Sequence, residues 1–159
     1  MKTIYQNKKS ITGILHYDIV KNGKVLSTEN YNLTVNNSSR VLARLVGMQG
    51  TYSNSAITQI GFGTANAAAS STATNLGGTV YRKAISSVTY SSGAPYDVQF
   101  NFTLEEDEFN GNDIWQFGLF TGDNVLFSML SRNPSKGNAI EKDDEVVIVG
   151  YWKLEFRNV

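Results

Sequence analysis

The sequence predicts a mainly β protein: an antiparallel β-sandwich with one short α-helix near residues 38–48. Three observations support this fold class. Apolar and polar residues alternate along several short segments, most clearly in Tyr96–Leu104, as in strands with one buried face. Turn signals such as Asn22-Gly23 separate these segments. Asn, Ser, Thr and Gly are plentiful and only 18% of residues are charged, which is typical of a β-rich chain with many turns.

The length and composition bound the possible functions. The 159 residues fit one domain, predicted over residues 11–159 after a polar, flexible arm of residues 1–10. There is no cysteine, which excludes disulfides and thiolate chemistry. Because 14 basic and 14 acidic side chains balance, the sequence argues against nucleic-acid binding and favours another protein as partner. No signal peptide or membrane-spanning stretch is recognisable, so we expect synthesis in a cytosol and no membrane association.

A β-hairpin is predicted near the N-terminus. Ile11–Val20 alternates as a strand, and Asn22-Gly23 fits a type I′ turn, in which both central residues take positive φ. Lys24–Thr28 then returns as the second strand. The alternation continues through three apolar residues that extend this strand: Tyr31, Leu33 and Val35.

The short helix follows the hairpin. Asn36–Ser39 supplies candidate N-cap residues, and Gly47 or Gly50 is expected to end the helix. Apolar residues recur at helical spacing within Arg40–Met48 and predict one buried face: Val41, Leu42, Leu45 and Val46.

The stretch Ile57–Lys83 joins the two halves of the chain. It contains Gly61-Phe62-Gly63, an Ala/Ser/Thr/Asn-rich segment and Gly77-Gly78. These glycines lack the spacing of a phosphate-binding loop or of a dinucleotide fingerprint. We therefore expect two tight backbone positions joined by a long surface loop.

The remainder of the chain predicts antiparallel strands at short intervals with turns between them, a sandwich or Greek-key pattern. Trp115 and Trp152 fall at strand period and are expected in the core. The predicted strands are Ala84–Tyr90, Tyr96–Leu104, Ile114–Phe120, Val125–Leu130 and Glu145–Phe156.

No residue is predicted to be catalytic, cofactor-binding or metal-binding. The acidic run Glu105–Asp113 is the strongest metal candidate, but Phe109 interrupts the ligand spacing of an EF-hand loop, so we expect a solvated turn. His16 is the only histidine, which makes a zinc site from one chain improbable, and we expect it to face solvent or an interface. A glycan hydrolase using the carboxylates of Glu105–Glu108 is a distant alternative.

The order of motifs resembles the small tail-associated structural proteins of tailed bacteriophages and prophages, a family of tail-fibre and collar-type β-sandwich proteins. The resemblance covers about residues 15–156. Gln116 departs from the pattern, because an acidic residue is often seen at that position. The motifs that carry it are the helix Ser38–Met48, Ile57–Thr64, Asn75-Leu76, Arg82–Ile85, Phe100–Leu104, Asn110-Gly111, Ile114–Phe120, Leu126–Ser128 and Trp152–Phe156.

This resemblance implies a virion protein of the tail region, a tail-tip, collar or fibre-attachment adaptor, that is not an enzyme and needs no cofactor. Its expected partners are other copies of itself, as a homo-oligomer, and neighbouring virion proteins. Residues 1–10 are equally compatible with a disordered tail and with an arm that orders on a neighbouring subunit.

Two alternatives remain open. One is a host receptor- or carbohydrate-binding sandwich that uses the loops Ala65–Asn75 and Asn133–Asn138 and the indole of Trp115 or Trp152. The other is a head decoration or head-fibre protein.

Overall fold

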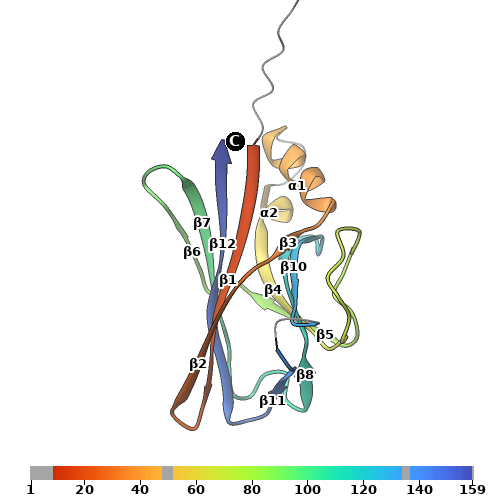
Figure 1. The fold of residues 1–159 in the computed structure, drawn as a ribbon. Helices are drawn as coiled ribbons and strands as arrows, with labels where there is room; N and C mark the ends of the chain where they lie inside the picture. The colour runs from red at the N-terminus through yellow and green to blue at the C-terminus, as the bar shows by residue number, and fades with distance from the viewer. Residues whose placement is uncertain (1–8, 48–51, 134–136, 159) are drawn as a thin grey trace, which may run out of the picture.

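The protein is an antiparallel β-sandwich, as the sequence predicts. A computed structural model describes residues 9–47, 52–133 and 137–158. Two five-stranded sheets face each other, and a two-stranded sheet lies at the end opposite the helix α1 (Figure 1). Every strand pair in these sheets is antiparallel.

The first sheet is built around the two ends of the chain. The strand β1 pairs with β12 over its full length, from Lys9 opposite Asn158 to Lys21 opposite Val146. Lys9 and Ser10 therefore belong to the sheet and not to the predicted arm, whose residues 1–8 lie outside the described residues. The order in this sheet is β2 (Lys24–Tyr31), β1 (Lys9–Lys21), β12 (Val146–Asn158), β7 (Tyr96–Leu104) and β6 (Ser87–Tyr90).

The second sheet takes its strands from the middle of the chain, and the small third sheet covers one end. The second sheet has the order β3 (Leu33–Thr34), β10 (Leu126–Ser131), β9 (Gln116–Thr121), β4 (Ile57–Gly63) and β5 (Val80–Ala84). The third pairs β8 (Asn112–Ile114) with β11 (Ile140–Lys142).

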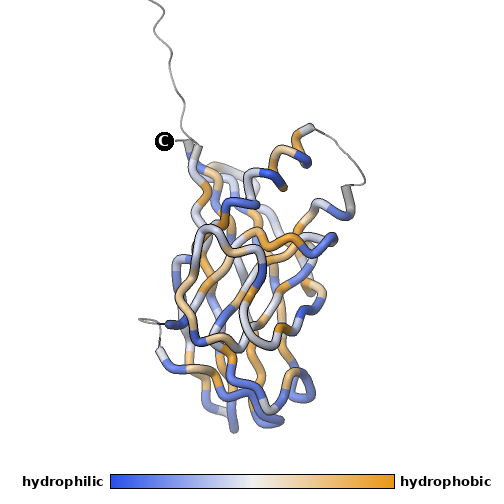
Figure 2. Tube along the Cα trace, turned by 90° about the vertical axis from the view of Figure 1, so that its right-hand side faces the viewer, coloured by the Kyte–Doolittle hydropathy of each residue, from blue (hydrophilic) through white to orange (hydrophobic). Residues whose placement is uncertain are grey.

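The core fills the space between the two large sheets, where apolar residues of both sheets pack together. Apolar and polar residues alternate along many of the strands (Figure 2). The ring of Phe62 packs edge-on against Phe102 and Phe117, and Tyr17 stacks on Phe117 with 4.7 Å between ring centroids. Trp152 and Leu15 are fully buried beside them. The alternation that predicts β1, β7 and β12 therefore reports the inner face of the first sheet.

The second sheet is covered on its outer face as well. The long loop from Thr64 to Thr79 lies across that face, and its Leu76 packs with Phe120 and Met129 in a second apolar cluster. Ala69 and Ala73 of the same loop pack against this cluster. All residues of β9 and β10 are buried as a result, which explains why these strands read as nearly continuous apolar runs.

Gly61 and Gly63 are strand residues and not turn positions. Gly61 lies between Arg82 of β5 and Gly118 of β9 in the register. A Cβ atom on Gly61 would come within 2.5 Å of Cε2 of Phe120. The glycine thus makes room for an aromatic ring on the outer face of the sheet, while the predicted surface loop begins only after Gly63.

The helix α1 (Asn37–Val46) forms close to the predicted position. It begins at Asn37 without a side-chain cap from Asn36, and the N–H of Gly47 donates to the carbonyl of Ala43 at its end. Val46 is 84% exposed, so it does not belong to the buried face that the sequence predicts. A short second helix, α2 (Tyr52–Ser55), was not predicted.

Three predicted strands are divided in the structure. Residues 84–90 cross from the second sheet to the first, so β5 ends at Ala84 and β6 starts at Ser87. Leu33 and Thr34 do not extend β2 but pair with Met129 and Ser128 in the second sheet. Residues 114–120 are split between β8 and β9 because Trp115 lies between the two strands.

Candidate functional site

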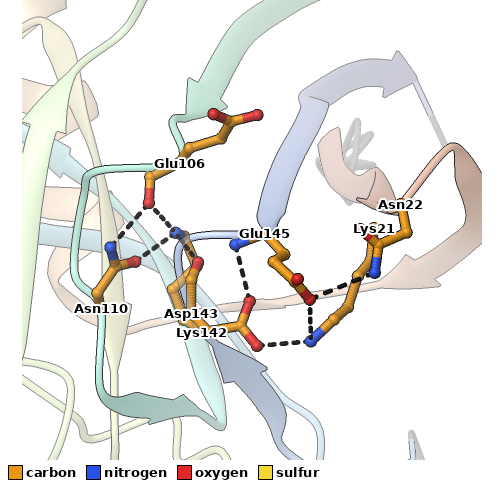
Figure 3. A network of polar contacts seen from close by, with 7 residues as sticks. All are labelled: Lys21, Asn22, Glu106, Asn110, Lys142, Asp143 and Glu145. Carbon is orange, nitrogen blue, oxygen red and sulfur yellow. Dashed lines mark hydrogen bonds and ion pairs between the residues drawn. The ribbon is translucent and has the colours of Figure 1, made fainter.

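The acidic loop between β7 and β8, the strongest metal candidate in the sequence, surrounds the side chain of a lysine. Lys142 of β11 is 2% exposed, and its Nζ donates to the carbonyl of Glu106 at 3.1 Å and to Oδ1 of Asn110 at 2.7 Å (Figure 3). It also donates to the carbonyl of Asp143 at 2.8 Å. Burial lowers the pKa of Lys142, and the charges of Asp143 and Glu108 partly offset that effect. The ammonium group of Lys142 thus holds the loop in place through hydrogen bonds to its oxygen atoms.

The Glu108 carboxylate of this loop is held by basic and hydroxyl groups of β5. It lies 2.5 Å from Nζ of Lys83 and accepts hydrogen bonds from the Tyr81 hydroxyl at 2.9 Å and the Glu105 N–H at 2.8 Å. Burial raises the pKa of Glu108, but the hydrogen bond from Lys83 and the other donors outweigh it and leave the pKa below its usual value. In the part of the chain that the structure describes, no three acidic or histidine side chains converge as a metal site.

His16 lies on the outer face of the first sheet, half-buried. Its ring stacks on Tyr151 with 5.0 Å between centroids, and its Nε2 is 3.4 Å from Oδ1 of Asp18. A shallow hollow of about 320 Å³ opens beside these side chains, with Asn101 and Thr103 on its far side. The prediction that His16 faces solvent or an interface agrees with this position.

The two tryptophans occupy different environments. Trp152 is fully buried in the core, as predicted. Trp115 is only partly buried, so its predicted core position is wrong. Its N–H donates to the carbonyl of Gly63 and its carbonyl accepts from the N–H of Arg132, beside the ends of β4 and β10 in the second sheet. Because Trp152 cannot reach a ligand, a carbohydrate platform built on that indole is excluded.

The loop Ala65–Asn75 is fixed to the second sheet by a buried amide. Oε1 of Gln116 accepts the N–H of Gly77 at 2.8 Å, and its Nε2 donates to the carbonyl of Ala67 at 3.2 Å. Asn133 hydrogen-bonds Asn66 of this loop, so the two predicted contact loops meet there. Residues 134–136 of the second loop lie outside the described residues.

An apolar groove opens at the end of the sandwich where α1 lies. There the inner face of the first sheet extends beyond the second sheet, and α1 stands opposite. The groove has a volume of about 350 Å³, and those of its lining residues that the structure describes are all apolar or aromatic; they include Leu42, Leu45, Val88, Tyr90, Val98 and Phe156. Tyr90 is 76% exposed, and Val88 and Phe156 are each 40% exposed.

The sequence did not reveal this groove, although part of the signal was present. Val98 and Phe100, on the predicted inner face of β7, line the groove. An inward position becomes exposed only where the opposing sheet ends, and that depends on the strand lengths of both sheets. Groove residues from β6, β12 and α1 therefore look like ordinary core positions in the sequence.

Among the described residues, the structure shows a packed core, an apolar groove at one end and a polar hollow on one face. Within the described residues, no helix has both the length and the apolar character needed to cross a membrane. Comparison with protein-family models, with curated proteins and with solved structures finds no match for this chain.

Proposed function

We propose that this chain is a structural protein of a tailed-bacteriophage particle, located in the tail region, that works by oligomeric assembly. The observation that carries the proposal is the apolar groove at the α1 end. Solvent-exposed apolar surfaces of this kind mark contacts with other proteins, because burying them against a partner releases water and lowers the free energy. The resemblance to tail-associated proteins supplies the setting, and the proposed role needs no catalysis and no cofactor.

Tyr90 provides the sharpest test of this role, because it lines the groove yet is largely exposed. Replacing Tyr90 by Asp puts a charge into the groove without disturbing the core, so the variant should fold but fail to enter particles. Val46→Asp is the matched control, since Val46 is exposed and apolar but does not line the groove. Immunogold electron microscopy of particles carrying each variant measures incorporation.

The position of the gold label separates the forms of the proposal. Label on tails supports the tail assignment, and label on capsids supports a head decoration or head-fibre protein instead. Absence of label from both intact and disrupted wild-type particles would refute a role in the virion.

A second candidate function is binding of a host receptor or carbohydrate at the hollow beside His16. The observation in its favour is the aromatic ring of Tyr151 with Asp18 and Thr103 nearby, since sugars bind proteins through aromatic faces and polar side chains together. Binding on a glycan array that is lost in Tyr151→Ala would support this function. An array without signal for the wild-type protein would count against it.

A further inference from the structure

β2 is a long edge strand of the first sheet with several large apolar side chains exposed to solvent. It has 8 residues, whereas the edge strands β5, β6 and β3 have 5, 4 and 2. Val25, Leu26 and Tyr31 are 60%, 62% and 72% exposed. Protected edges are short, bulged, interrupted by proline or charged. β2 pairs with β1 without a bulge, contains no proline and carries charges only at Lys24, next to the turn, and Glu29. Among the described strands, β2 is therefore the edge best suited to accept another strand.

The register shows which backbone groups of β2 are free. The N–H of Asn32 donates to the carbonyl of Gly13, directly beyond the pair Tyr31–Ile14. Hydrogen-bonded and non-hydrogen-bonded pairs alternate along an antiparallel ladder. The even-numbered residues of β2 therefore bond to β1, and four odd-numbered residues direct their N–H and C=O groups outward: Val25, Ser27, Glu29 and Tyr31.

We propose that β2 pairs with β2 of a second copy of this chain, antiparallel, about a two-fold axis at Thr28. The two first sheets then form one continuous sheet across the axis (β2 is shown at the sheet edge in Figure 1). The inference rests on the proposed assembly function and names one of its partners, a second copy.

The position of the axis follows from the free groups. An axis at Thr28 places Val25 opposite Tyr31 of the second copy and Ser27 opposite Glu29, so each outward-facing residue meets another and exchanges two hydrogen bonds with it. An axis at Ser27 would place Tyr31 opposite Gly23 in the turn. An axis at Glu29 would place Val25 opposite Leu33, which belongs to the second sheet.

The side chains are self-complementary in the same register. Val25 with Tyr31 is a β-branched–aromatic pair and Thr28 faces its own copy, and both kinds of cross-strand pair are favourable. Glu29 lies opposite the hydroxyl of Ser27, so no like charges are directly opposed. Because one strand supplies both halves of the contact, the interface fits a two-fold homodimer better than an unrelated partner.

The lack of cysteine makes disulfide trapping a clean test. Thr28 and its copy form a non-hydrogen-bonded pair, whose Cα atoms are separated by about 4.5 Å, within the range of a disulfide. Thr28→Cys should therefore give a disulfide-linked dimer on mild oxidation, seen on a non-reducing gel. Ser27→Cys is the matched control and should form no disulfide-linked dimer, because the two Ser27 positions lie diagonally across the axis.

The two cross-linking experiments test the proposed register of the β2–β2 contact. Cross-linking of Ser27→Cys in place of Thr28→Cys would overturn the axis at Thr28. Cross-linking of neither variant, with circular dichroism showing both folded, would overturn the pairing of β2 edges.

A proline variant tests the same contact without cysteines. The N–H of Ser27 points away from β1, so Ser27→Pro should leave the monomer folded with an unchanged melting temperature while it blocks the second strand. Light scattering on concentrated wild-type protein should show a dimer, and Ser27→Pro should halve the mass. A wild-type oligomer that survives Ser27→Pro would overturn the pairing but leave the proposed assembly function standing, because particle labelling tests that function independently.

Discussion

Gln116 holds the long loop on the second sheet through both ends of its amide. A glutamate at this position could still accept from the Gly77 N–H but could not donate to Ala67 while ionised. We expect Gln116→Glu to lower the free energy of unfolding by about 2 kcal/mol at pH 7, because a buried carboxylate would face a carbonyl oxygen.

The loss in Gln116→Glu should depend on pH. Burial raises the pKa of such a carboxyl group, and its protonated form can donate to Ala67, so stability should recover partly as the pH falls below about 5. Urea unfolding of the variant and of the wild type from pH 4 to pH 8 measures this. A loss that stays the same at all pH values would contradict the role of the amide donor.

Glu108 should make the wild-type protein sensitive to acid. Its folded pKa is lowered, so its contribution to stability is present above the unfolded pKa near 4.3 and is lost as the pH falls through the folded value. Glu108→Gln should lose about 1–2 kcal/mol at pH 7 and flatten the pH dependence of unfolding below pH 5. The neighbouring exposed Glu106→Gln is the control, since only the backbone carbonyl of Glu106 is engaged. Equal effects of the two substitutions would count against the ion pair with Lys83.

At the scale of the elements, Gly150 of β12 lies where β1 leaves no room for a side chain. A Cβ atom there would collide with the carbonyl oxygen of His16 and lie 2.9 Å from Cζ of Phe102. Gly150→Ala should therefore force the two strands apart and cost about 1–3 kcal/mol. Gly93→Ala, in the β6–β7 turn, meets no atom within 4 Å and should change the melting temperature little. Thermal unfolding compares the two, and a neutral Gly150→Ala would show that the strands can separate freely.

Long strands that are buried on one face could be predicted from the sequence, and the points where the chain changes sheets could not. Residues 96–104 alternate because one sheet covers them, so their pattern identifies β7 directly. Residues 84–90 show a similar alternation, yet the chain leaves one sheet at Ala84 and joins the other at Ser87. Local periodicity does not distinguish an inward position in one sheet from an inward position in the next.

The candidate sites depended still more on distant contacts. The acidic loop was recognised as a turn, but Lys142, which organises it, lies on β11 and comes to the loop only through the pairing of β11 with β8. The groove likewise depends on where the second sheet stops. Spacing along the chain carries information about neither arrangement.

At the scale of the whole molecule, the strand order pairs segments that are far apart in the sequence, so we expect slow folding. The first sheet is closed only when β1 meets β12, from the other end of the chain, and contacts between such distant segments slow folding. We expect refolding in milliseconds to seconds. In Trp115→Phe, the buried Trp152 is the single remaining indole, and stopped-flow fluorescence of that variant reports core formation. A microsecond phase with the full amplitude would contradict this.

The same pairing has a consequence during synthesis. β1 leaves the ribosome early, but β12 follows only after more than a hundred further residues, roughly ten seconds later at an elongation rate of about 5–20 residues per second. Until then the edge of β1 that β12 will occupy is vacant. A β12 strand from a second copy would match the same edge, so exchange of the last strand between copies competes with intramolecular closure until the chain is complete.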